Sequence, residues 1–377
     1  IRDRGKVLVQ GYKEGGILPK WPLASSYTGC MVGYPAVSVL ADLVAKDLAE
    51  GDMSTWAEAG ARSSVYREDL AEKFKGTREL DLITMHPYYK EKYGFVPADS
   101  VPESVSWGLE MAYEDWCISQ IAKKAGNMEL ANEYAKKAEY YKRYLDPETK
   151  MMRPVMGDGS FRTPFNPRYS SHMKSDYTEG NAFQWSFFAP HDMDNFIAAI
   201  GGKKELETRL DTLFTTSSQI DGAEASGDIT GLIGQYAHGN EPSHHMAYLY
   251  NWTDSPWKGQ GYLDYIMQNF YTNEPDGIIG NEDCGQMSAW YVMSALGFYQ
   301  VSPGIPVYTL GRPMIDKALI HVKGGIFEIV ATNNNPANKY VKEVKLNGKV
   351  LETPFISHSD IINGGKLEFI MTDQPVK

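Results

Sequence analysis

The sequence predicts a mainly α-helical protein, an α/α toroid that is followed by a small β-domain. Up to about residue 300, apolar helices alternate with helices that carry one charged face. An inner ring of buried helices inside an outer ring of amphipathic helices produces this alternation. After residue 303 the apolar pattern changes to period two. We therefore predict a helical barrel over residues 1–303 and a β-domain over 304–377.

The helical segments are predicted where apolar residues recur at helical spacing, with breaks at Gly126 and Pro190. They cover 104–126, 127–146, 181–202, 204–214, 242–252, 256–271 and 285–299. The first two segments follow one another with almost no loop, so we expect an antiparallel hairpin. Apolar residues on all sides assign 181–189, 244–250 and 286–298 to the inner ring, and a charged face assigns 127–146 and 204–214 to the outer ring.

The β-domain is predicted from short alternating runs that are separated by Gly and Asn turns. These runs cover 306–313, 317–325, 326–334, 339–352 and 366–372. We expect a small sheet that packs on the helical part.

Composition excludes several classes of function. The net charge is −11 and no long basic run occurs, which disfavours nucleic acid and anionic membranes as partners. No apolar run is long enough to span a bilayer. The cysteines, Cys30, Cys117 and Cys284, are far apart in the sequence and form neither a disulfide framework nor a zinc spacing.

Three polar segments each precede a mostly apolar helix, and they are the candidate site. Asp176 and Glu179 precede the helix at 181, Asn240 and Glu241 the helix at 242, and Asn281, Glu282 and Asp283 the helix at 285. The inner helices of a toroid run parallel to one another, so their N-termini converge at one end. We therefore expect the three segments to meet in one funnel.

Helix capping is the alternative for each segment, because Asp, Asn and Glu are common in first helical turns. A cap needs only one such residue, whereas each segment carries more than one, which favours chemistry. Cleavage of a glycosidic bond requires one protonated and one ionised carboxyl group. Glu179 precedes apolar Ala182, Phe183 and Trp185, which disfavour its charged form and suit an acid. Asp283 lies beside helix N–H groups that favour the ionised form, which suits a base.

Oxygen donors dominate these segments. Asn181, Gln184, Asn240, Glu241, Asn281 and Asp283 are hard ligands, so a bound metal is expected to be calcium and not zinc. His244 and His245 are adjacent and point about 100° apart on a helix. One is expected to face the funnel and the other to pack, and a hydrogen-bonded core histidine is the alternative for either.

Trp21 lies between Lys20 and Pro22 in the turn-rich stretch 17–33. An exposed tryptophan here could stack on a sugar face, and a structural tryptophan wedged into the core is the alternative.

Long motifs give the chain a family resemblance. They are LPKWPLASSYTGCMVGYPAVSVLADL, AYEDWCISQIAKKAGN, DYTEGNAFQWSFFAPHDM, GNEPSHHMAYLYNW and PDGIIGNEDCGQMSAWYVMSALGFYQVSPGIPVYTLGRP. With the C-terminal strands, they strongly resemble glycoside hydrolase family 92, the calcium-dependent, inverting exo-α-mannosidases. The resemblance implies an N-terminal β-sandwich and an (α/α)6 barrel. The sandwich is absent from this sequence and the barrel is expected to lack its first helices. Because the sequence starts at Ile1 inside a helical pattern, we expect a piece of a longer polypeptide.

The resemblance assigns roles residue by residue. Glu179 in TEGNAFQW matches the general acid and Asp283 in GNEDCG matches the general base. Many relatives carry an aspartate two positions before the base, where this chain has Asn281, which can hold the water but cannot deprotonate it. Calcium is assigned to Glu241, Asn240 and Asn181. Substrate binding is assigned to Trp21, His244, His245, Gln184 and Glu282.

The implied function is calcium-assisted, inverting hydrolysis of terminal α-mannose from glycans of the N-glycan or yeast-mannan type. The two carboxyl groups of an inverting enzyme stand about 6.5–9.5 Å apart, whereas a separation near 5 Å indicates retention. The alternatives are a non-catalytic glycan-binding fragment and another toroid-fold glycosidase or lyase. The absent sandwich favours the fragment, and the negative net charge disfavours a lyase that acts on polyanions.

Overall fold

The structure is a computed structural model that describes residues 2–23, 26–28, 30–73, 75–76 and 85–376. The chain divides into two compact units. The first comprises Ile1–Met193, Ile220–Ser226 and Pro303–Ile305, and the second comprises Asp194–Gln219, Gly227–Ser302 and Pro306–Lys377.

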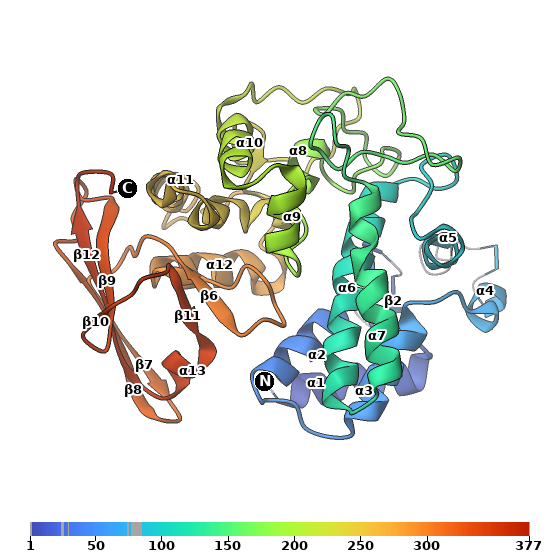
Figure 1. Cartoon of the computed structure of the whole chain (residues 1–377), viewed down its shortest axis with the longest axis horizontal. Helices are drawn as coiled ribbons and strands as arrows, with labels where there is room; N and C mark the ends of the chain where they lie inside the picture. The colour runs from blue at the N-terminus through green and yellow to red at the C-terminus, as the bar shows by residue number, and fades with distance from the viewer. Residues whose placement is uncertain (1, 24–25, 29, 74, 77–84, 377) are drawn as a thin grey trace. The chain divides into compact units, whose positions relative to one another are not determined.

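The first unit is built from helices and one short hairpin (Figure 1). Its helices are α1 (Arg2–Gly15), α2 (Ala36–Ala45), α3 (Met53–Ser63), α4 (Glu68–Lys73), α5 (His86–Tyr93), α6 (Ser104–Lys124), α7 (Met128–Lys137), η2 (Ala138–Arg143) and α8 (Ala182–Trp185). The hairpin strands are β1 (Pro22–Leu23) and β2 (Ser26–Tyr27).

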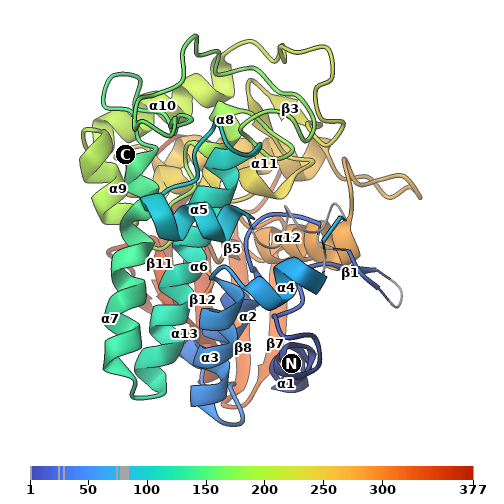
Figure 2. The same cartoon turned by 90° about the vertical axis from the view of Figure 1, so that its right-hand side faces the viewer.

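Helix α6 is the centre of this unit, and the predicted hairpin with α7 is confirmed: the two helices lie side by side (Figure 1 and Figure 2). Gly126 has a φ of 78°, which favours glycine, and ends α6. The side chain of Asn127 then accepts a hydrogen bond from the Leu130 N–H at 3.1 Å and starts α7. Gly108 lets Tyr144 lie against α6, because a Cβ at Gly108 would collide with the Tyr144 ring.

The second unit combines helices with the C-terminal strands. Its helices are α9 (Met193–Ile200), whose first residue still belongs to the first unit, α10 (Lys203–Thr215), η3 (Glu241–Ser243), η4 (Met246–Trp252), α11 (Pro256–Asn269), η5 (Asp283–Gly285), α12 (Gln286–Ala295) and α13 (His358–Ile362). A short hairpin, β3 (Leu232–Ile233) with β4 (Tyr236–Ala237), lies between α10 and η3 in the sequence.

Two sheets follow α12. The smaller has the order β11–β6–β5, from Phe355–Ser357, Val307–Leu310 and Phe298–Tyr299, and all its pairs are antiparallel. The larger has the order β10–β9–β12–β8–β7, from Lys349–Val350, Tyr340–Leu346, Gly365–Thr372, Gly325–Thr332 and Lys317–Val322. Strand β12 pairs parallel with β8 and antiparallel with β9.

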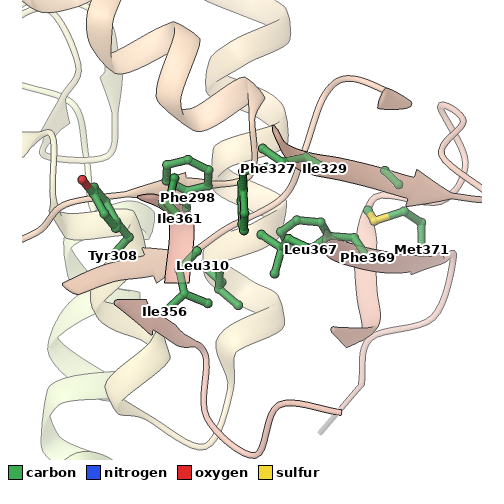
Figure 3. Close-up of a cluster of buried hydrophobic side chains, with 11 residues drawn as sticks. Phe298, Tyr308, Leu310, Phe327, Ile329, Ile356, Ile361, Leu367, Phe369 and Met371 are labelled. Carbon is green, nitrogen blue, oxygen red and sulfur yellow. The ribbon is translucent and has the colours of Figure 1, made fainter. Parts of the chain in front are cut away.

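The buried side chains of both sheets form one apolar core (Figure 3). Phe327, Leu367 and Phe369 are fully enclosed there. On β12 the buried residues Leu367, Phe369 and Met371 alternate with less buried ones, which is the period of two that the sequence shows.

Most predicted elements are confirmed, and two differ in kind. Segment 181–202 breaks around Pro190 into α8 and α9, and 204–214 corresponds to α10. Segment 242–252 was predicted as one helix but forms two short 3-10 helices, η3 and η4. Segment 285–299 ends earlier than predicted, because Gly297 has a φ of 93° and the chain continues as strand β5.

The expected burial of 286–298 on all sides is wrong for α12. Met287 and Trp290 are buried, whereas Ala289 and Val292 on the opposite face are exposed. Because apolar residues such as Ala289 and Val292 also occupy the exposed face of α12, its sequence resembles that of a fully buried helix. By contrast, Met246–Tyr250 in η4 are buried on all sides, as predicted. Within the described ranges, no helix has the length and apolar character that crossing a membrane requires.

Candidate active site

The loop that carries Glu179 is anchored on the N-terminus of α6. The first N–H groups of a helix have no partner within the helix and need acceptors. Here the Val105 N–H donates to the Asp176 carbonyl oxygen at 3.0 Å. The Thr178 N–H in turn donates to the Ser106 hydroxyl at 2.8 Å. Loop and helix therefore form one rigid support within the first unit.

Asp176 belongs to this support and does not present a free carboxylate. It is buried, accepts a hydrogen bond from the Ser104 hydroxyl at 3.0 Å and forms an ion pair with Arg162 at 3.0 Å. Burial raises the pKa of Asp176, and the charge of Arg162 opposes that rise. The side chain fixes the start of the loop.

Glu179 differs from all its neighbours in the stretch 175–182: it is partly exposed, whereas the others are buried. Its φ is 46°, a left-handed conformation that is rare for a residue with a side chain. Such strained positions persist only when the surrounding structure holds them, and they are frequent at functional sites. The anchored loop provides that hold, and it turns this one carboxyl group out of a buried segment.

Asn181 and Gln184 form a capping box at the start of α8. The Asn181 side chain accepts from the Phe183 N–H at 2.9 Å, and the Gln184 side chain accepts from the Asn181 N–H at 2.7 Å. Both residues are buried. The capping alternative therefore describes these contacts, and the assignments of Asn181 to calcium and Gln184 to substrate stay predictions.

The second and third polar segments converge within the second unit. Both start with Gly-Asn-Glu, at 239–241 and 280–282. The backbones of Gly239 and Gly280 lie in close contact. A Cβ built on Gly280 would lie only 2.6 Å from the Gly239 Cα. Gly280 also has a φ of 74°. This contact holds Asn240 and Glu241 next to the segment that carries Asp283, as the toroid hypothesis expects for these two segments.

Glu282 and Asp283 are neighbours in the chain, but only Glu282 caps a helix. The Glu282 carboxylate accepts from the N–H groups of Gly285 and Ser288 and so caps the start of α12. Hydrogen bonds from Ser288 and from the Gly285 N–H lower the pKa of Glu282. Since Glu282 serves as the cap, the neighbouring Asp283 is left available.

Asp283 is exposed, and no residue in the described ranges hydrogen-bonds to or pairs with its carboxylate. Its φ is 49°, and Cys284 and Gly285 continue at 55° and 104°. Three successive left-handed residues make a sharp corner, which projects the Asp283 side chain away from the helix start. Asn281, two positions earlier, donates to the Asp228 carboxylate at 3.0 Å, which orients its amide.

Both adjacent histidines are buried, and the prediction that one of them faces the funnel stays a prediction. His244 is buried, its Nε2 lies 3.0 Å from the His238 carbonyl oxygen, and its Nδ1 lies 3.1 Å from the Gln286 amide nitrogen. Nε2 therefore donates to the carbonyl and Nδ1 accepts from the amide. Burial lowers the pKa of His244 to about 4, so the ring is neutral at pH 7. These are the contacts of the core-histidine alternative, and sugar binding by His244 and by the buried His245 stays a prediction.

Trp21 is 45% exposed, which favours the stacking interpretation over the wedged one. It directly precedes the β1–β2 hairpin, and its carbonyl oxygen accepts from the Thr28 hydroxyl at 2.6 Å. The adjacent Lys20 places its ammonium 4.5 Å from the centroid of the buried Trp107 ring. The loop is thus fixed through Lys20, and Trp21 remains open to a ligand.

The second polar segment offers oxygen donors that could hold a metal ion. In the part of the chain that the structure describes, no group of three or more His, Cys, Asp or Glu residues is placed to hold an ion. That excludes the usual zinc arrangement for these residues. Glu241 and Asn240 offer a carboxylate and an amide oxygen on one fixed loop, which suits calcium when carbonyl oxygens and water complete the shell. These oxygen donors fit calcium, which does not need three carboxylate ligands.

Sequence reasoning missed four residues that build this region. The repeated Gly-Asn-Glu tripeptide could have indicated Gly239 and Gly280, because two backbones approach this closely only where residues lack side chains. Asp228 had no sequence signal, since 53 positions separate it from Asn281. His238, which links the Tyr236 and Tyr271 hydroxyls at 2.8 and 2.7 Å, also had none.

Replacing Gly280 by alanine is expected to displace both loops. The new Cβ would collide with the Gly239 backbone, and a φ of 74° costs a residue with a side chain about 1–3 kcal/mol. We expect a lower melting temperature and a large loss of glycosidase turnover. Gly227→Ala is the matched control, because a Cβ there meets nothing within 4 Å. Equal stability and turnover in both variants would show that the glycine contact has no role.

Comparisons with known proteins identify the family of the chain. The model of the glycosyl hydrolase family 92 catalytic domain matches residues 2–373. The family GH92 α-mannosidase BT3965 from Bacteroides thetaiotaomicron, solved in complex with mannoimidazole, is 38% identical with a TM-score of 0.89, over 100% of this chain and 48% of that chain. The family GH92 inverting mannosidase BT2199 from the same organism is 30% identical with a TM-score of 0.85, over 98% and 50%. An uncharacterized secreted glycosidase from Arthroderma benhamiae is 23% identical, over 97% of this chain and 48% of its own length.

The family match places the chain among the glycoside hydrolases. The chain belongs to glycoside hydrolase family 92, as its motifs indicated. Its mainly helical fold with a C-terminal sheet region is that of the family's catalytic domain. The chain spans about half the length of the relatives it matches.

Proposed function

We propose that the chain is the catalytic part of an exo-acting α-mannosidase that removes terminal α-mannose from glycans with inversion. The observation that carries the proposal is that Glu282, and not Asp283, caps the start of α12. Glu282 satisfies the helix, so Asp283 is left as an exposed carboxylate without a structural partner in the described ranges. The similarity to an α-mannosidase and to an inverting mannosidase supports the choice of sugar and stereochemistry.

In the proposed reaction Glu179 gives its proton to the glycosidic oxygen as the bond from that oxygen to C1 breaks. Asp283 accepts a proton from a water molecule, whose oxygen forms the new bond to C1 on the opposite face. Asn281 positions this water through its amide, which Asp228 orients. The products are mannose of inverted configuration and the shortened glycan. An inverting enzyme needs about 6.5–9.5 Å between the two carboxyl groups to admit the water.

We propose calcium as the metal, with Glu241, Asn240 and Asn181 as the residues that would hold it. When bound, calcium would bind sugar hydroxyls and favour a flattened ring. The chain's own contribution is the loop geometry that the Gly239–Gly280 contact fixes. Trp21 would stack on the sugar or its neighbour, while His244, His245, Gln184 and Glu282 would border the sugar.

The test is release of mannose from mannobioses of defined linkage and from yeast mannan, with the product anomer followed by proton NMR. We expect the β-anomer to form first, activity to disappear with a chelator and to return with added calcium. The same samples should show a rise in melting temperature with calcium, which Glu241→Gln abolishes. The α-anomer as first product would contradict inversion, and mannoside binding without turnover would favour the glycan-binding alternative.

A further inference from the structure

The second unit contains a groove that none of the three polar segments enters. One wall is α11 and the other is formed by Lys339 and the first residue of β9, Tyr340. Helix α11 contacts β9 within this unit, and Figure 1 shows the two elements near each other. The groove has a volume of about 600 Å³. Small-molecule sites typically measure about 300–1,000 Å³, so the groove has room for an oligosaccharide segment.

The sequence of α11 explains the shape of the groove. Trp257, Gly261 and Tyr265 are spaced by four residues and lie on one face of the helix. Gly261 leaves that face open at its middle, and a Cβ there would approach the Tyr340 ring to 3.8 Å. The Trp257 and Tyr340 rings meet edge to face at 6.3 Å. Aromatic rings thus border the space over Gly261, which has no side chain to fill it.

The polar residues of the groove are mostly uncharged or neutralised. Lys258 is paired with Glu207 at 2.7 Å and with Asp211 at 2.6 Å. Asp264 is paired with Arg312 at 3.1 Å. Gln268 and Asn269 add exposed amides, whose nitrogens donate to the Asp264 carboxylate at 2.8 Å and to the Tyr265 carbonyl oxygen at 2.7 Å. Lys339 adds one exposed ammonium. A polyanion would need several free cations, so this lining suits a neutral ligand with many hydroxyl groups.

We propose that the α11–β9 groove is a non-catalytic binding site for a neutral glycan chain. Tyr265, which is 50% exposed, provides a ring for the apolar face of a sugar, and the amide oxygens of Gln268 and Asn269 can accept hydrogen bonds from its hydroxyls. Binding here would hold a polymeric substrate on the enzyme and raise its local concentration. The choice of mannan as the glycan rests on the function proposed above.

The experiment is affinity electrophoresis of the full chain in gels that contain yeast mannan, with Glu179→Gln as background to prevent hydrolysis. Tyr265→Ala and Gln268→Ala are each expected to weaken mannan binding about tenfold, which is ~1.4 kcal/mol. Tyr169→Ala is the matched control, because Tyr169 is 47% exposed and lies in the first unit. In the active background, kcat/KM for a small aryl mannoside should be the same in all variants, whereas KM for mannan should rise only in the groove variants.

Two results would overturn the groove proposal. One is retardation by mannan that is equal in the Tyr265→Ala and Tyr169→Ala proteins. The other is absence of retardation in mannan, galactomannan and xylan gels alike, which would point to a protein segment as the occupant. The test is independent of the catalytic assignment, because Tyr265-dependent binding without mannosidase activity would refute the proposed function and leave the groove site standing.

Discussion

Glu179→Gln should lower kcat for a mannobiose by about 10²–10⁴-fold, the usual contribution of a general acid. The amide has nearly the same shape, so the anchored loop at the start of α6 is expected to persist. The loss should depend on the leaving group. A dinitrophenyl mannoside needs no proton on its departing oxygen, so its turnover should fall far less than that of the disaccharide. Initial rates on both substrates measure this difference.

The control for Glu179→Gln is Glu224→Gln, a surface glutamate whose carboxylate is paired with Lys174 at 2.7 Å. Its turnover should match that of the parent protein, and thermal unfolding should show that both variants fold. Equal losses on the disaccharide and on the activated mannoside would argue that Glu179 is not the acid. Full activity of the variant on the disaccharide would remove Glu179 from the mechanism.

Asp283→Asn is expected to lower turnover by about 10²–10⁴-fold on both kinds of substrate, because water must be activated whatever group departs. No described residue hydrogen-bonds to the Asp283 side chain, so its replacement should leave the melting temperature almost unchanged. Azide, which needs no deprotonation, should attack C1 in place of water and restore turnover of the activated mannoside. The product should be the β-mannosyl azide, which NMR identifies.

Asp276→Asn is the matched control for Asp283, since Asp276 is also exposed and lies seven positions earlier in the chain. It should keep full activity and show no response to azide. If Asp283→Asn spared the activated mannoside but not the disaccharide, Asp283 would be the acid and the two roles would be exchanged. An α-mannosyl azide would contradict attack from the opposite face.

The fold was predictable where periodicity was strong. Segment 104–126 was recognised almost to the residue as α6, and the alternation after residue 303 correctly indicated strands. The strand β5 and the 3-10 helices η3 and η4 were not predicted, because their apolar runs are short. Such runs have no period of their own, and tertiary contacts decide their conformation. Strand β11 was missed for the same reason, since it has three residues and pairs with β6, from which strands β7 to β10 separate it in the sequence.

The candidate site was predictable as a set of residue types and not as a set of contacts. The sequence singled out three polar segments before helices, and the structure brings two of them together through Gly239 and Gly280. The sequence did not reveal which side chains cap helices. Asn181, Gln184 and Glu282 satisfy backbone N–H groups, whereas Asp283 does not. Capping and catalysis use the same residue types, so only local geometry separates them.

The backbone contact between Gly239 and Gly280 has a consequence for regulation by ions. One loop presents Glu241 and the other presents Asp283, and neither can shift without pushing its neighbour. An ion that ordered the first loop would therefore also restrict the position of Asp283, the proposed base, on the second loop. The calcium response of such an enzyme would be seen in kcat as well as in KM.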